Sequence, residues 1–253
     1  MAKLSVNLNL VFDDESFADR IERAAAAGAD AVGVFGKEPA ELRALVDVAT
    51  DHGLTFAYAS SLVGPINEPQ NVETRVSEIE DAVALADELG IECLNVTPGQ
   101  DLEGVSDSTQ FAATVETLRR GAPAAADADV TLVMEPLNTA VDHPGRWLVE
   151  SGRAFEIVTA VDHPNVGVLF DVYHQQVTEG NVTERLTENV DAVGHVHVAD
   201  VPGRHEPGTG ELAYERLLPA LLEAGYDGYV GCEFTPVGDP EAAVARVGEM
   251  LEL

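Results

Sequence analysis

The chain has 253 residues, 45% of them hydrophobic, and is therefore long enough to bury a large core. Its 45 acidic and 14 basic residues give a formal net charge of −31, and Lys3 and Lys37 are its only lysines. This balance argues against a nucleic-acid partner, because phosphate contacts need clustered lysine and arginine, and no apolar run is long enough to suggest a membrane partner.

Strand-like and helix-like patterns alternate along the whole chain. The strands are expected at residues 4–12, 30–35, 54–59, 91–96, 130–135, 166–171, 192–198 and 228–234. Helical patterns follow them in turn, up to Gly28, at 39–52, from about Asn71 to Gly90, across about 108–126, from about Ser151, around 181–190, at 212–224 and from about Asp239.

Strands separated by helices predict parallel βαβ units, and eight such units in this length predict a closed barrel. The expected fold is therefore an α/β protein, a (β/α)8 TIM barrel in a single domain over residues 1–253. The alternative is a doubly wound open sheet. That fold normally has a glycine-rich turn after its first strand, and the segment "NLVFDDES" is not such a turn.

In such a barrel the functional site lies at the carboxyl ends of the strands. Four successive strands end on polar donors, namely Glu135, Asp171, His197 and Glu233. Their separations of 36, 26 and 36 residues are close to one strand–helix unit, so we expect them to converge. An acidic residue after a strand is often only a helix N-cap. Four polar residues at the ends of four consecutive strands are harder to explain in that way.

Three carboxylates cannot all remain ionised in so small a space without a cation among them. Oxygen and imidazole donors without thiolates suit a divalent ion such as Mn²⁺, Mg²⁺ or Co²⁺. We therefore predict that Glu135, Asp171, His197 and Glu233 bind a divalent metal ion.

The loop 201–211, "VPGRHEPGTGE", is the least regular stretch of the chain. An anionic substrate that approaches a net charge of −31 needs a local counter-charge, which predicts Arg204 as a substrate-binding residue. Glu206, in the same loop, is also predicted to be a substrate-binding residue. His174, just behind Asp171, is expected to orient a substrate oxygen. The alternative for Arg204 is that it pairs with surface acids. The alternatives for His174 are that it supports the metal ligands from behind or that it merely starts a helix.

Several segments resemble the hydroxypyruvate isomerase family within the xylose-isomerase-like TIM barrels of the sugar isomerase/epimerase superfamily. They are "EPLN", "FDVYHQQ", "GHVHVADVPGRHEPGTGE" and "GYDGYVGCEF". The resemblance implies a metal-dependent isomerase of the aldose–ketose type, an intramolecular oxidoreductase acting on a small hydroxy-carbonyl compound. It also implies that Glu135 and Glu233 are both metal ligands and the catalytic acid–base pair, with Asp171 and the residue at position 197 completing the coordination.

The expected reaction is the conversion of hydroxypyruvate to tartronate semialdehyde, or of a related 2-oxo acid, through a cis-enediolate. Bacterial hydroxypyruvate isomerases tend to carry glutamine where this chain has His197, whereas the related ketose 3-epimerases carry histidine. A ketose 3-epimerase acting on free sugars is therefore the main alternative. Others are a non-catalytic sugar-binding barrel, a metal-dependent aldolase or dehydratase, and an abasic-site endonuclease, which needs more histidine ligands and a basic groove. Barrels of this type often pair, which suggests a homodimer or homotetramer.

The acidic excess is typical of strongly hydrated proteins that work at molar salt, which predicts a halophilic protein. The start of the chain lacks a secretory signal pattern and no apolar run could span a membrane, which predicts a cytoplasmic protein. Cys93 and Cys232 lie in apolar runs and are expected as buried free thiols. Near 1 M salt the Debye length is about 3 Å, so repulsion between the acids is largely screened. We expect the free energy of unfolding to rise from dilute buffer to concentrated KCl. Urea titrations followed by circular dichroism test this, and a value independent of salt contradicts it.

Overall fold

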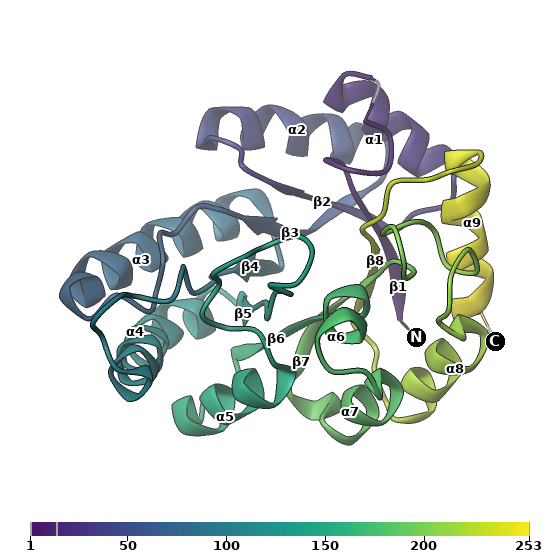
Figure 1. Ribbon diagram of the computed structural model, residues 1–253. Helices are drawn as coiled ribbons and strands as arrows, with labels where there is room; N and C mark the ends of the chain where they lie inside the picture. Colours follow the sequence, from purple (N-terminus) through teal and green to yellow (C-terminus); the bar gives the residue numbers. More distant parts are fainter. Residues whose placement is uncertain (1, 14, 253) are drawn as a thin grey trace.

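Eight parallel strands close into a barrel in the computed structural model, which describes residues 2–13 and 15–252 (Figure 1). Each strand pairs with the next in the chain, and the last pairs with the first. The strands are β1 Lys3–Asn7, β2 Ala31–Phe35, β3 Thr55–Ser60, β4 Cys93–Asn95, β5 Thr131–Met134, β6 Val166–Asp171, β7 Val193–Val198 and β8 Tyr229–Cys232. The expected (β/α)8 barrel is confirmed, and the open-sheet alternative is wrong.

Helices surround the barrel and cover its outer face (Figure 1). The described helices are α1 Phe17–Ala26, α2 Pro39–Asp51, α3 Val72–Leu89, α4 Asp107–Asp127, α5 Ser151–Val161, α6 Val172–Thr178, α7 Val182–Glu188, α8 Tyr214–Glu223 and α9 Pro240–Leu251, with short 3₁₀ turns η1 Pro69–Asn71 and η2 Val190–Ala192. Several begin at a side-chain cap. Ser16, Ser106 and Asp239 each accept a hydrogen bond from the backbone N–H three residues later.

The first strand is shorter than the expected segment 4–12, because Asn7 ends it. The Asn7 side-chain oxygen accepts from the backbone N–H of Asn9 at 2.8 Å, and its carbonyl accepts from Val11 at 3.3 Å. These bonds turn the chain away from the sheet. The residues that follow still carry a strand-like apolar pattern because Leu8, Val11 and Phe12 are buried in the core.

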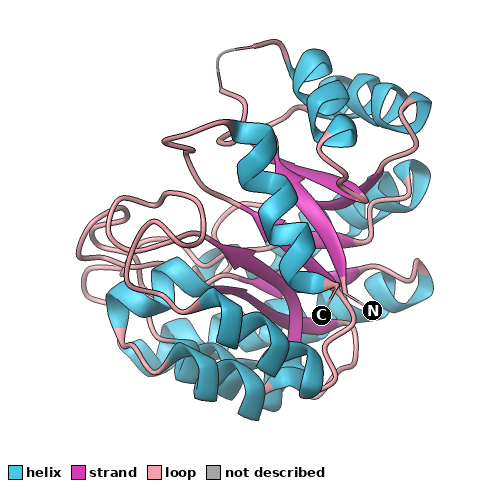
Figure 2. Cartoon of the chain, turned by 90° about the vertical axis from the view of Figure 1, so that its right-hand side faces the viewer, coloured by secondary structure: helices cyan, strands magenta, loops and turns pink. Residues whose placement is uncertain are grey.

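Long loops gather at one end of the barrel, and the chain termini lie away from them (Figure 2). This end carries the carboxyl ends of the strands, where side chains from different strands meet. Cys93 and Cys232 are both buried and free, as expected. Within residues 2–13 and 15–252 no helix has the length and apolar character needed to cross a membrane.

One glycine is required for the shape of the barrel interior. A Cβ atom on Gly33 of β2 would lie 2.0 Å from Cε1 of Tyr58 on β3, so only glycine leaves room for this ring. The Tyr58 ring is 1% exposed and its hydroxyl is hydrogen-bonded to the Asn7 side chain. Tyr58 therefore forms part of the floor beneath the strand ends.

Candidate active site

Four donor groups converge at the carboxyl end of the barrel. Glu135 follows β5, Asp171 ends β6, His197 lies in β7 and Glu233 follows β8. Each offers one ligand atom, and these atoms all lie within 4.8 Å of one another. All four side chains are buried, and Glu135, the most accessible, is 8% exposed. The convergence expected from the one-unit spacing is confirmed, whereas the roles of the four groups remain predictions.

The contacts of these groups fit a divalent cation. Nδ1 of His197 lies 3.1 Å from Oε2 of Glu233 and 4.0 Å from Oε1 of Glu135. Both ring nitrogens of His197 are buried and have no hydrogen-bond partner among the described residues. A buried unpartnered nitrogen beside three carboxylates needs a further partner. The mixed oxygen and nitrogen donor set is suitable for Mn²⁺, Mg²⁺ or Co²⁺.

The two carboxylate oxygens of Asp171 face different partners. Its Oδ1 accepts from the backbone N–H of His174 at 3.1 Å and caps α6, so the helix start considered as the alternative for His174 is present. Its Oδ2 faces the cluster, 3.6 Å from Nε2 of His174. The N-cap and metal-ligand interpretations of this acid are therefore compatible, since each uses a different oxygen.

Burial and the neighbouring charges displace the pKa values of the two glutamates in opposite directions. Burial, followed by the charge of Glu233, raises the pKa of the Glu135 carboxyl to about 8. Burial also acts to raise the pKa of Glu233, but the charges of His197 and Arg204 outweigh it and hold that pKa below its ordinary value. Shifted pKa values of buried carboxyl groups are typical of functional sites, and both of these groups lie at this end of the barrel.

Arg204 reaches into the cluster from the loop after β7. Its Nη2 donates to Oδ2 of Asp171 at 3.2 Å and to Oε2 of Glu233. Its backbone adopts a left-handed φ of 57°, and its guanidinium group lies 5.3 Å from the centre of the Tyr173 ring. The alternative that Arg204 pairs with surface acids is wrong, because both of its acidic partners belong to the site.

Glu206 lies elsewhere. Its Oε2 accepts from the backbone N–H of Val237 at 2.9 Å, and it is not among the described residues that line the pocket. The structure therefore places Glu206 outside this lining, and its role in substrate binding stays a prediction. Its carboxylate holds the loop after β8 against the loop after β7.

His174 faces the pocket with a defined proton. Its Nδ1 lies 2.6 Å from Nδ2 of Asn138, whose Oδ1 accepts from the backbone N–H groups of Val141 and Asp142. Asn138 must therefore donate to Nδ1, which places the imidazole proton on Nε2. Burial lowers the pKa of His174 to about 4, so the ring is neutral. Nε2 is buried, has no hydrogen-bond partner among the described residues and lies 4.0 Å from Oε1 of Glu135.

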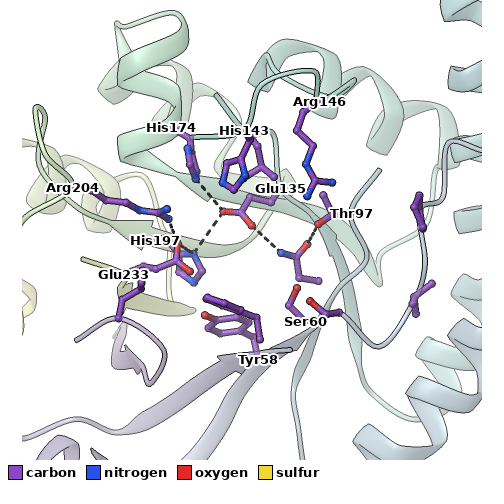
Figure 3. Close-up of a pocket in the computed structure, with 17 residues that line it drawn as sticks. Tyr58, Ser60, Thr97, Glu135, His143, Arg146, His174, His197, Arg204 and Glu233 are labelled. Carbon is purple, nitrogen blue, oxygen red and sulfur yellow. Dashed lines mark hydrogen bonds and ion pairs between the residues drawn. The ribbon is translucent and has the colours of Figure 1, made fainter. Parts of the chain in front are cut away.

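A pocket of about 360 Å³ opens above these groups (Figure 3). Its lining includes side chains that the sequence analysis did not select, among them Tyr58, Ser60, Asn95, Thr97 and Arg146. Asn95 ends β4 and donates to Oε2 of Glu135 at 2.9 Å, while Asn7 ends β1 and donates to Oε1 of Glu233 at 2.7 Å. Both asparagines lie at strand ends, so the rule that located the four donors would also have found them.

Comparison with known proteins places the chain in one family. Residues 21–252 match the family model described as xylose isomerase-like TIM barrel. The chain is 31% identical to hydroxypyruvate isomerase of Escherichia coli (strain K12), over 96% of this chain and 97% of that protein. It is 34% identical to 2-oxo-tetronate isomerase of Cupriavidus necator, over 93% and 94% of the two chains.

Among solved structures, one of an AP endonuclease, family 2, from Brucella melitensis superposes with a TM-score of 0.90 at 29% identity, covering 98% of this chain and 99% of that one. The curated relatives named above are isomerases that match nearly end to end. The chain is therefore an isomerase that belongs to the xylose isomerase-like TIM barrel family.

Proposed function

We propose that the chain is a divalent-metal-dependent isomerase of a small hydroxy-2-oxo acid. The observation that carries this proposal is the convergence of Glu135, Asp171, His197 and Glu233 within 4.8 Å at the active end of the barrel. The names of its relatives, hydroxypyruvate isomerase and 2-oxo-tetronate isomerase, support the substrate class. Hydroxypyruvate is the smaller candidate.

The proposed reaction moves hydrogen between neighbouring carbons of one molecule. Hydroxypyruvate loses a proton from C3 to give an enediolate across C2 and C3. A proton then returns at C2 and the oxygen protons redistribute, which gives tartronate semialdehyde with no atom gained or lost. A divalent cation held by the four donors would stabilise the negative charge that develops on the two adjacent oxygens.

Glu135 and Glu233 are the proposed acid–base pair. Asn95 holds Oε2 of Glu135, and Asn7 holds Oε1 of Glu233. These bonds fix each carboxylate and leave its other oxygen directed at the donor cluster, near His197. A carboxylate fixed in this way is suited to proton transfer, because general acid–base catalysis depends on hydrogen-bonding reach to the reacting carbon or oxygen.

His174 is the proposed donor to a substrate oxygen. Its neutral ring presents the Nε2 proton between Asp171 and Glu135, at 3.6 Å and 4.0 Å from their nearest oxygens. A substrate oxygen that gains negative charge in the reaction would accept this proton in a hydrogen bond. The Asn138 amide keeps the ring in this tautomer.

Incubation with hydroxypyruvate and Mn²⁺ in D2O, followed by proton NMR, tests the proposal. The expected result is tartronate semialdehyde with solvent deuterium at the carbon that receives the proton. Turnover of free ketoses but of neither oxo acid would overturn the proposal in favour of a 3-epimerase, the second candidate, which His197 favours by resemblance. Release of water or a smaller fragment would identify a dehydratase or an aldolase.

The similarity to an AP endonuclease raises a further candidate, cleavage of DNA at abasic sites. The net charge of −31 opposes DNA binding. Two cationic side chains, Arg146 and Arg204, line the pocket as far as the chain is described, and Arg204 is occupied by carboxylates. We expect no nicking of plasmid DNA that contains abasic sites.

Replacement Asn138→Ala is expected to reduce kcat by about 10- to 100-fold, because His174 loses the bond that fixes its tautomer. Asn138 is fully buried, so we also expect a loss of about 1–3 kcal/mol in the free energy of unfolding. Kinetics at a temperature where the variant is fully folded separate the two effects.

The matched control is Asn189→Ala, which removes a half-buried amide that donates to the Arg185 carbonyl on α7. This variant should retain the wild-type kcat. A loss of activity in Asn138→Ala that only follows the unfolded fraction would contradict the positioning role of Asn138.

A further inference from the structure

The pocket is lined by two arginines that differ in their partners. Arg204 pairs with Asp171 and Glu233, two of the predicted metal ligands. Arg146, in the loop after β5, is half-buried and forms no ion pair with any acid in the described part of the chain. Figure 3 shows Arg146 on the Thr97 side of Glu135 and Arg204 on the Glu233 side.

Backbone hydrogen bonds hold Arg146 in place. The loops after β4 and β5 are joined where Trp147 donates to the carbonyl of Gly99 at 3.1 Å and Asp101 donates to that of Gly145 at 2.8 Å. Nη1 of Arg146 donates to the carbonyl of Pro98 at 3.1 Å. Among the described residues this is the one acceptor for its guanidinium group, so Nε and Nη2 retain N–H donors for a ligand.

The charges of the cluster leave none to balance an anionic substrate. Glu135, Asp171 and Glu233 carry three negative charges when ionised. The proposed divalent cation and Arg204 together supply three positive charges. The formal charge of the site is then zero, and the negative charge of a substrate carboxylate has no counter-charge within it. Arg146 is the cation in the described pocket lining that is left to supply one.

We propose that Arg146 binds the carboxylate of the substrate and so selects 2-oxo acids over neutral ketoses. This inference rests on the proposed isomerase function. In this proposal C2 and C3 of the substrate lie at the donor cluster, and its C1 carboxylate lies on the Thr97 side of the pocket, where Arg146 is found. Two guanidinium N–H donors suit a planar carboxylate, because the fork geometry of arginine matches its two oxygens.

The test compares Arg146→Gln with the wild type on two compounds of the same carbon skeleton. Hydroxypyruvate carries the carboxylate, and dihydroxyacetone has a hydroxymethyl group in its place. KM and kcat are measured for hydroxypyruvate, and the inhibition constant of dihydroxyacetone is measured against it. We expect KM for hydroxypyruvate to rise about 10- to 100-fold with kcat nearly unchanged, and the inhibition constant to change less than about twofold.

Two further variants complete the design. Arg146→Lys keeps the charge without the fork and should recover part of the lost affinity. Arg119→Gln removes an exposed arginine that donates to the Ala160 carbonyl on α5 and should leave both constants unchanged.

An unchanged KM in Arg146→Gln would overturn this inference alone, provided that the wild type converts hydroxypyruvate. An equal rise in KM for hydroxypyruvate and in the inhibition constant of dihydroxyacetone would also overturn this inference. That result would mean that Arg146 supports the loop rather than binds the carboxylate. A wild-type protein that converts ketoses but neither oxo acid would overturn the proposed function, and this inference with it.

Discussion

Replacement Glu233→Gln is expected to lower kcat for hydroxypyruvate by about 10³-fold or more, because the amide can neither accept nor return the proton. Glu233 accepts hydrogen bonds from Asn7 and Arg204 and lies 3.1 Å from Nδ1 of His197. Glutamine keeps the volume of the side chain and one acceptor oxygen, so we expect the barrel to fold. Turnover and deuterium exchange by NMR, with circular dichroism for the fold, provide the measurement.

Glu215→Gln is the matched control for this replacement. Glu215 forms an exposed ion pair with Arg246 at 3.2 Å on the outside of the barrel, and its loss should change kcat by less than about twofold. Residual turnover of Glu233→Gln above about one tenth of the wild-type value would refute its role in proton transfer.

Removal of divalent cations is expected to have an effect of similar size. Treatment with EDTA should abolish both turnover and solvent exchange, and Mn²⁺, Mg²⁺ or Co²⁺ should restore them. Binding to the folded state should also stabilise it by about 2.7 kcal/mol at an ion concentration of 100 times Kd. Thermal unfolding with and without the ion measures this effect without reference to activity.

Asp171→Asn should greatly reduce the increase in unfolding temperature that the ion causes. The replacement removes one negatively charged metal-binding oxygen but keeps an oxygen that can cap α6. Asp107→Asn, which alters an exposed partner of Arg153, is the control and should retain the full shift. A chain that contains no divalent ion by elemental analysis and works equally well after EDTA would rule out the metal-dependent proposal.

The arrangement of the barrel and of its four donors was predictable from local patterns. Alternating strand and helix periods repeat in units of similar length, and parallel strands all end on the same rim. Residues at successive strand ends must therefore approach each other, as Glu135, Asp171, His197 and Glu233 do. Asn7 and Asn95 obey the same rule but were missed, because neutral amides were not sought among the strand-end donors.

The loops were predictable only in part. Arg204 and Glu206 are two residues apart in one irregular segment, and the sequence analysis assigned both to substrate binding. Folding separates them, since Arg204 turns inward to Asp171 and Glu206 accepts a hydrogen bond from Val237, 31 residues away in the chain. No local pattern indicates which of the two enters the site.

Sequence alone therefore determined the barrel, its active end and the four converging donors, because strand direction and the spacing of repeated units are local properties of the chain. Tertiary structure decided the tautomer of His174, the inward turn of Arg204 and the position of Arg146. Each of these depends on bonds between loops, such as those from Asn138 to His174 and from Arg146 to Pro98. Such bonds join residues that are distant in the sequence, and they exist only once the strands have brought their loops together.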